Sequence, residues 1–169
     1  MNFQETIDES IEVQQKSDYE IERNKPMPNK LHGILQSEIT FQLRLTYNDQ
    51  FDFPTEVSLN TQPGSTPDIC IFKKSKQFIR EEIQAKESEM PITTIEIISP
   101  SQPLDEMTRK VRKIYFPKGV KSAWIVVPTF KGIHLMLPGD KNSYFDSGIL
   151  KDPTTGIEIS IEDIFKRII

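Results

Sequence analysis

Residues 93–127 read TTIEIISPSQPLDEMTRKVRKIYFPKGVKSAWIVV and carry the clearest indication of the fold class. Its two ends, residues 93–99 and 123–127, are short runs rich in β-branched residues and are typical of strands. Between them, apolar residues recur at the three- and four-residue spacing of a helix from about Leu104 to Phe116. A strand, a helix and a strand of these lengths predict two parallel strands joined by a helical crossover.

Further elements flank this unit. The charged residues 73–91 predict an exposed helix or loop, and Ser160 and Asp163 have the spacing of a helix cap. The remaining patterns predict a helix from about Lys30 to Leu45, strands over 53–60, 68–72 and 132–137, and a short closing helix within 160–169. We therefore expect an α/β protein, with a loose N-terminal segment over residues 1–18 and a single domain over 19–169.

The composition excludes several classes of protein. Hydrophobic residues make up 36% and charged residues 27% of the 169, as in ordinary globular proteins. We expect no membrane segment and no export signal, and hence a cytoplasmic protein. The single cysteine, Cys70, excludes an internal disulfide and a zinc site built from several cysteines. It is interpreted as a small buried hydrophobic residue.

Two carboxylates stand in apolar strands. Strand alternation places Asp68 and Cys70 on one face, and it places Glu96 on a face with Thr94. A buried carboxylate is costly unless a cation compensates it, and a divalent metal would relieve the repulsion between two of them. Removing one carboxylate would then stabilise the metal-free protein. Alternatively, Asp68 opens its strand in a Pro-Asp turn, and Glu96 pairs with a nearby basic residue.

Several short motifs together resemble one bacterial protein family. A Pro-Asp pair opens one strand, Glu96 precedes a Ser-Pro-Ser sequence, and Lys110 lies on the following helix. This arrangement resembles the Uma-type restriction endonuclease family, which is similar to the PD-(D/E)xK nuclease superfamily. The resemblance covers residues from about Tyr19 to Leu137. The other matching positions are His32, Tyr115, Gly119-Val120 and Trp124.

The resemblance implies a restriction endonuclease-like fold with a central mixed β-sheet flanked by helices. It also implies a homodimeric endonuclease that uses Mg²⁺ or Mn²⁺ to hydrolyse phosphodiester bonds in DNA. Asp68, Glu96 and Lys110 would be catalytic, and Asp68, Glu96 and the main-chain carbonyl of Ile97 would hold the metal. The alternative is a catalytically inactive nuclease fold that binds nucleic acid or a protein partner.

Three further residues are candidate accessory groups. Glu56 is a candidate extra metal ligand, although an exposed strand position explains it equally well. His32 and Gln36 share one stripe of the first helix, where a structural hydrogen-bonding role is at least as plausible as a role in the site.

The position of the lysine differs from that of the superfamily, which places it two residues after the glutamate. Ile98 stands there, and the helix carries one extra residue between Lys110 and Tyr115 relative to the family spacing. At about 100° per residue, Lys110 lies about 90° from the centre of the apolar stripe, whereas Lys113 lies nearly opposite it. We therefore expect Lys110, and not Lys113, to reach the carboxylates.

The charge distribution suggests where nucleic acid would bind. Although the net charge is −4, residues 101–122 contain six basic and two acidic side chains. A basic surface beside the site predicts phosphate contacts, whereas a solvated, lysine-rich helix face is the alternative. The residues expected to contact DNA are Arg109, Arg112, Lys113, Lys118 and Lys121.

Overall fold

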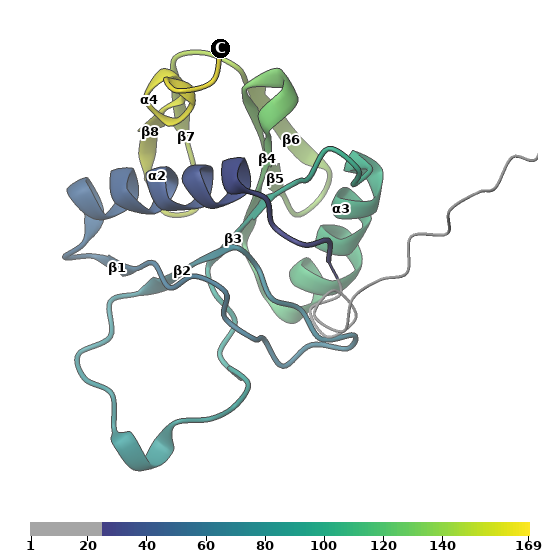
Figure 1. Cartoon of the computed structure of the whole chain (residues 1–169). Coiled ribbons are helices and arrows are strands. Elements are labelled where there is room, and N and C mark those ends of the chain that lie inside the picture. Colours follow the sequence, from purple (N-terminus) through teal and green to yellow (C-terminus); the bar gives the residue numbers. More distant parts are fainter. Residues whose placement is uncertain (1–24) are drawn as a thin grey trace, which may run out of the picture.

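The computed structural model describes residues 25–169 and contains a mixed six-stranded sheet (Figure 1). The segment predicted to be loose, residues 1–18, lies outside the described residues. β3 and β4 are parallel, as the strand, helix and strand pattern predicts, and all other neighbours are antiparallel. In spatial order the strands are β1 (Phe51–Asp52), β2 (Ile69–Lys73), β3 (Thr93–Ile97), β4 (Ser122–Val127), β5 (Gly132–Leu137) and β6 (Lys141–Phe145).

Helices cover both faces of this sheet (Figure 1). On one face lie α2 (Lys30–Tyr47), the hairpin of β7 (Ile149–Lys151) and β8 (Glu158–Ser160), and α4 (Ile161–Phe165). On the other face lies α3 (Leu104–Lys110), which continues into a π-helical segment, Val111–Tyr115. The α/β class and the restriction endonuclease-like arrangement expected from the sequence are therefore confirmed. Within residues 25–169, no helix combines the length and apolarity needed to cross a bilayer.

Alternation along the strands divides the core into two clusters. In β4, Trp124 and Val126 contribute to the cluster under α2, whereas Ala123 and Ile125 pack beneath α3. All six residues of β4 are buried, because helices cover the strand from both sides. Glu96, paired in register with Ile125, faces the α3 side.

Side-chain caps determine where two helices begin. The Asn29 side chain accepts a hydrogen bond of 2.9 Å from the backbone N–H of His32, so α2 starts at Lys30. This start places His32 at the head of the buried stripe of the helix. Ser160 caps α4 by accepting from the Asp163 N–H at 3.2 Å, as its spacing predicts.

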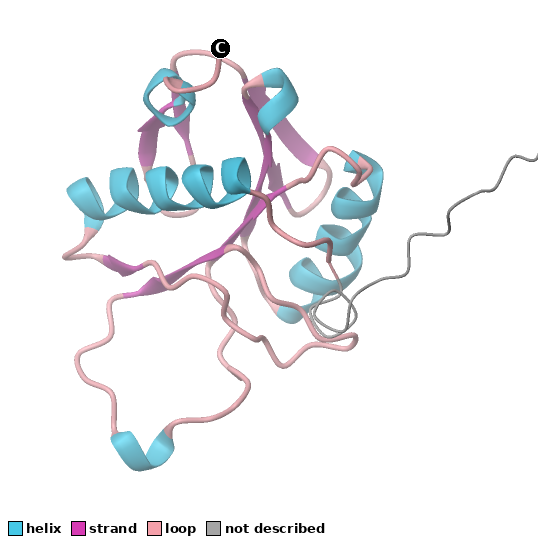
Figure 2. Cartoon of the chain, viewed as in Figure 1, coloured by secondary structure: helices cyan, strands magenta, loops and turns pink. Residues whose placement is uncertain are grey.

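Several segments differ from the sequence-based expectations, including the short strands β1, β7 and β8, which were not predicted. The predicted strand over 53–60 is wrong: Thr55 and Leu59 form only isolated bridges, because Pro54 lacks an N–H and Glu56 has a left-handed φ of 59°. β6 was not predicted because its residues are largely exposed and polar. The charged stretch 73–91 is an exposed loop that projects from the sheet and holds one 3₁₀ turn, Arg80–Glu82 (Figure 2).

Candidate metal centre

Asp68 lies immediately before β2 and is almost completely buried, with 1% of its surface exposed. Its Oδ2 accepts a hydrogen bond of 2.7 Å from the Ile97 backbone N–H. Its Oδ1 contacts Lys25 Nζ at 2.6 Å and His32 Nε2 at 3.0 Å. The carboxylate is therefore held by three separate segments of the chain: the residues before α2, α2 itself and the end of β3.

Glu96 projects from the middle of β3 and is also 1% exposed. Its Oε1 accepts hydrogen bonds from Lys110 Nζ at 2.8 Å and from the Tyr115 hydroxyl. Its Oε2 lies 3.9 Å from Lys25 Nζ. Asp68 and Glu96 thus face the same ammonium group, although Asp68 precedes β2, Glu96 lies in the neighbouring antiparallel strand β3, and the two are 28 positions apart.

Lys25 is a site residue that the sequence analysis missed. Its side chain is 6% exposed, and its ammonium also donates to the carbonyl of Thr66 at 2.7 Å. Lysine is almost never buried unless it is paired. Neither the spacing nor the apolar pattern around Lys25 distinguishes it from a surface lysine, so no signal in the sequence indicated this position.

The surroundings of Asp68 favour its ionised form. Burial by itself would raise the pKa of this carboxyl. The hydrogen bond from His32, the charge of Lys25 and the Ile97 N–H outweigh that effect and lower the pKa to about 2. Asp68 is therefore a carboxylate at neutral pH, as a ligand for a hard cation must be.

The predicted backbone ligand has a suitable position. Because the N–H and C=O of one strand residue point toward the same neighbour, the Ile97 carbonyl lies on the Asp68 side of β3. Ile98, the next residue, instead donates to Val126 of β4 at 3.1 Å. The Ile97 carbonyl can therefore approach a cation held by Asp68.

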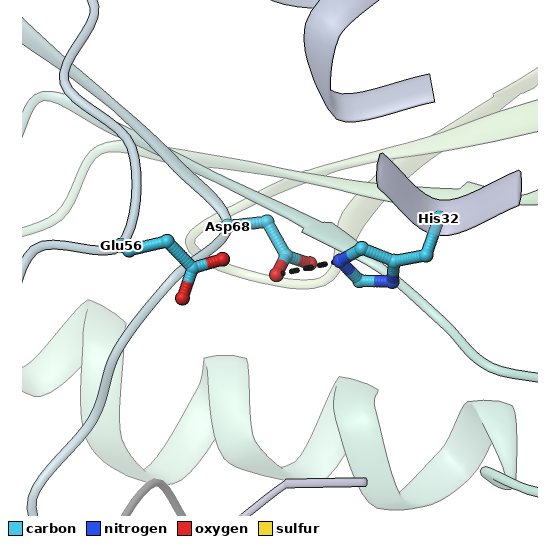
Figure 3. Close-up of side chains that lie close together, drawn as sticks. All are labelled: His32, Glu56 and Asp68. Carbon is cyan, nitrogen blue, oxygen red and sulfur yellow. Dashed lines mark hydrogen bonds and ion pairs between the residues drawn. The ribbon is translucent and has the colours of Figure 1, made fainter. Parts of the chain in front are cut away.

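The three accessory candidates surround Asp68. Figure 3 shows Asp68 between Glu56 and His32, which comes from α2. Ligand atoms of His32, Glu56 and Asp68 lie within 4.8 Å of one another. Gln36 donates to the Asp68 carbonyl at 2.8 Å and to Glu56 Oε1 at 3.1 Å. The left-handed φ of Glu56 is the kind of local strain that clusters at functional sites.

The π-helical segment accounts for the extra residue after Lys110. In an α-helix, residues five apart point in different directions, whereas a π-helix pairs residue i with i+5. Lys110 and Tyr115 are five apart and both contact Glu96 Oε1. Lys110 is thus at the carboxylate, as the helix geometry predicts, whereas Lys113 is exposed. The catalytic role of Lys110 stays a prediction.

Two neighbouring groups stay protonated. Burial and the nearby charge of Glu96 raise the pKa of Tyr115, so its hydroxyl remains a hydrogen-bond donor to Glu96. Burial, reinforced by Glu96, also raises the pKa of the Cys70 thiol. Cys70 is fully buried, which confirms its interpretation as a core residue and makes it a poor metal ligand or nucleophile.

The basic residues predicted to contact DNA lie in two regions of the chain. One region is the helix that carries Lys110, and the other is the segment just before β4. Arg109 and Lys113 flank Lys110 on one helical surface and are exposed. Arg112 is exposed but pairs with Asp140 at 3.1 Å. Lys118 and Lys121 precede Ser122, which pairs with Thr93 at the opposite end of β3 from Ile97. At about 3.3 Å per residue, this end lies about 10 Å along β3 from Glu96.

The family comparison matches residues 5–165 to the Uma2 model, described as "Putative restriction endonuclease". The chain belongs to the Uma2 family. The match includes Asp68, Glu96, Lys110 and also Lys25. No curated protein matched the sequence.

The fold of this Uma2 protein is shared with a solved structure. That structure is described as a putative nuclease belonging to DUF820 from Anabaena variabilis. It has 22% sequence identity and a TM-score of 0.71, and the alignment covers 85% of each chain. At this identity the likeness establishes the restriction endonuclease-like fold, and the chemistry has to be argued from the site.

Proposed function

We propose that this Uma2 protein is a metal-dependent endonuclease that hydrolyses phosphodiester bonds in DNA with Mg²⁺ or Mn²⁺. The observation that carries the proposal is the convergence of two buried carboxylates, Asp68 and Glu96, on one positive charge. Buried carboxylates on neighbouring strands repel each other unless a cation lies between them. The two carboxylates supply oxygen ligands of the kind that a divalent metal requires.

Asp68, Glu96 and the Ile97 carbonyl would hold this metal, with Glu56 and His32 as additional ligands beside Asp68. A bound Mg²⁺ would act as a Lewis acid on the phosphate and lower the pKa of a bound water. Gln36 orients Glu56 and the Asp68 backbone through its two hydrogen bonds. These contacts keep the ligands in place before substrate arrives.

Lys110 would stabilise the negative charge that develops on the attacked phosphate. Its side chain is 13% exposed, so it lies at the border between the buried carboxylate and the solvent. From that border a lysine side chain can reach a phosphate while keeping its contact with Glu96. Tyr115 positions Glu96 and does not need to ionise.

A cleft of about 470 Å³ reaches two of the proposed metal ligands, His32 and Ile97, and would provide space for substrate. It opens where β3 and β4 end, the edge at which open α/β sheets commonly bind ligands. Ile97 and His32 line it on the side of the metal centre, and Lys131 and the exposed Phe130 line it farther out. A phosphodiester in this cleft would lie next to the metal ligands.

Nicking of supercoiled plasmid tests the proposed activity. We expect nicked circles to accumulate with Mg²⁺ or Mn²⁺ and no cleavage with EDTA, with single-stranded RNA assayed in parallel. Cleavage of RNA but not of plasmid would contradict DNA as the substrate. If no nucleic acid is cleaved while Mn²⁺ still binds, the inactive binding module is the better description.

The salt dependence of DNA binding tests the basic surface around Lys110. Reversing Arg109 and Lys113 to glutamate should lower the slope of log affinity against log salt by about one unit per lost phosphate contact. Reversing Lys118 and Lys121 is the matched control, because it changes the same number of charges at the far end of β4. If the two double variants have equal slopes of log affinity against log salt, the basic surface around Lys110 is an ordinary solvated helix face.

The homodimer and the cytoplasmic location stay predictions. A dimer would bring two metal centres to the two strands of a duplex. The projecting loop over 73–91 supports this proposal, since Phe78, Ile79 and Ile83 are exposed on it and apolar surface of this kind favours association.

A further inference from the structure

Lys25 occupies the position between the two carboxylates that the proposed function assigns to a metal. Its ammonium is surrounded by oxygen atoms of Asp68 at 2.6 Å, Thr66 at 2.7 Å and Glu96 at 3.9 Å. We propose that Lys25 is an internal counter-ion that fills the cation position in the metal-free protein and leaves when a divalent cation binds. This inference rests on the proposed function.

The charge balance of the site supports displacement. In the metal-free protein, the two carboxylates are compensated by two ammonium groups, those of Lys25 and Lys110. Adding a divalent cation while both lysines stay would bury an excess of positive charge, which is costly without a counter-ion. Departure of Lys25 reduces that excess, and an incoming phosphate would compensate the remainder.

The contacts of the two lysines explain why Lys25 is the one that leaves. Lys25 faces both carboxylates, whereas Lys110 contacts Glu96 alone and lies over the Tyr115 ring, 5.3 Å from its centroid. Lys25 is also outside α2, four residues before the cap Asn29. Its flexible four-carbon side chain can therefore turn toward solvent without breaking a helix or a strand.

A displaced counter-ion has two consequences. Lys25 stabilises the metal-free site, and it lowers the affinity for divalent cations, because each binding event has to break a buried ion pair first. Lys25 would therefore determine the cation concentration at which the site fills.

Calorimetric titration of the full chain with Mn²⁺ tests this competition. Lys25→Met should bind Mn²⁺ about tenfold more tightly than the unaltered protein, since loss of a competing ion pair is worth at least one decade in affinity. Lys110→Met is the matched control: it removes one charge from Glu96 but none from the shared position, so its gain should be clearly smaller. Equal gains in Mn²⁺ affinity for Lys25→Met and Lys110→Met would mean that the net charge of the site, and not displacement of Lys25, sets the affinity.

Reductive methylation of lysine amines, read by mass spectrometry, provides a test in the unaltered protein and remains decisive if Lys25→Met does not fold. Lys25 should be protected without metal and become methylated at saturating Mn²⁺, whereas the exposed Lys113 should react in both states. Unchanged protection of Lys25 with Mn²⁺ bound would overturn the inference and leave the proposed metal centre intact. If neither the unaltered protein nor Lys25→Met binds Mn²⁺, the metal centre itself is wrong and the inference with it.

Discussion

Replacing Asp68 with Asn, or Glu96 with Gln, is expected to abolish calorimetrically detected Mn²⁺ binding and to lower plasmid cleavage by about a thousandfold. Each change keeps the shape of the side chain but removes the negative charge that a hard cation needs. Both carboxylates are 1% exposed, so water cannot easily replace the lost oxygen ligand. Glu158→Gln is a suitable control, because it removes one carboxylate charge from an exposed residue of β8 that pairs with Lys151, outside the proposed site.

The same variants should also destabilise the metal-free protein. If the two carboxylates repelled each other without compensation, removing one of them would stabilise the metal-free protein. Lys25 lies between them, however, and compensates that repulsion. Asp68→Asn removes the closest partner of a buried lysine, and breaking such a pair costs about 3 kcal/mol. Thermal unfolding in EDTA should therefore show a lower midpoint. Unchanged Mn²⁺ binding in both Asp68→Asn and Glu96→Gln would eliminate these residues as metal ligands.

Replacing Lys110 with Met should lower the cleavage rate about a hundredfold while Mn²⁺ binding persists. The ammonium lies 2.8 Å from Glu96 Oε1 and the side chain is only 13% exposed, so Lys110 carries its charge next to the proposed metal ligands. Methionine keeps most of the apolar contacts of the lysine stem but supplies no charge. Single-turnover cleavage at saturating Mn²⁺ measures this effect separately from metal affinity.

Lys113→Met provides the comparison, since Lys113 lies on the same helical stretch but is exposed. We expect it to weaken DNA binding and to leave the single-turnover rate within about threefold of the unaltered protein. A larger loss for Lys113 than for Lys110 would assign the catalytic lysine to Lys113.

Much of the fold follows from local patterns. The strands around Ile95 and Trp124 and the helix between them have distinct periodicities, so their parallel pairing was predictable. The strand predicted over 53–60 failed for a local reason, the left-handed backbone of Glu56, which its side chain does not signal. The π-helical segment was visible only as one extra residue after Lys110.

Asp68 and Glu96 could be found from the sequence because a carboxylate in an apolar strand breaks the pattern around it. Lys25, the counter-ion that these two carboxylates share, could not be found in this way. Lys25 is 43 positions from Asp68, in a stretch with no apolar periodicity. From the sequence, a lysine at this position looks like an ordinary surface residue. Local sequence thus determined the central parallel strands and which of the residues near them do not suit a core. The cation that compensates the two carboxylates became evident from the three-dimensional arrangement alone, because burial and charge pairing depend on segments that meet in space and not along the chain.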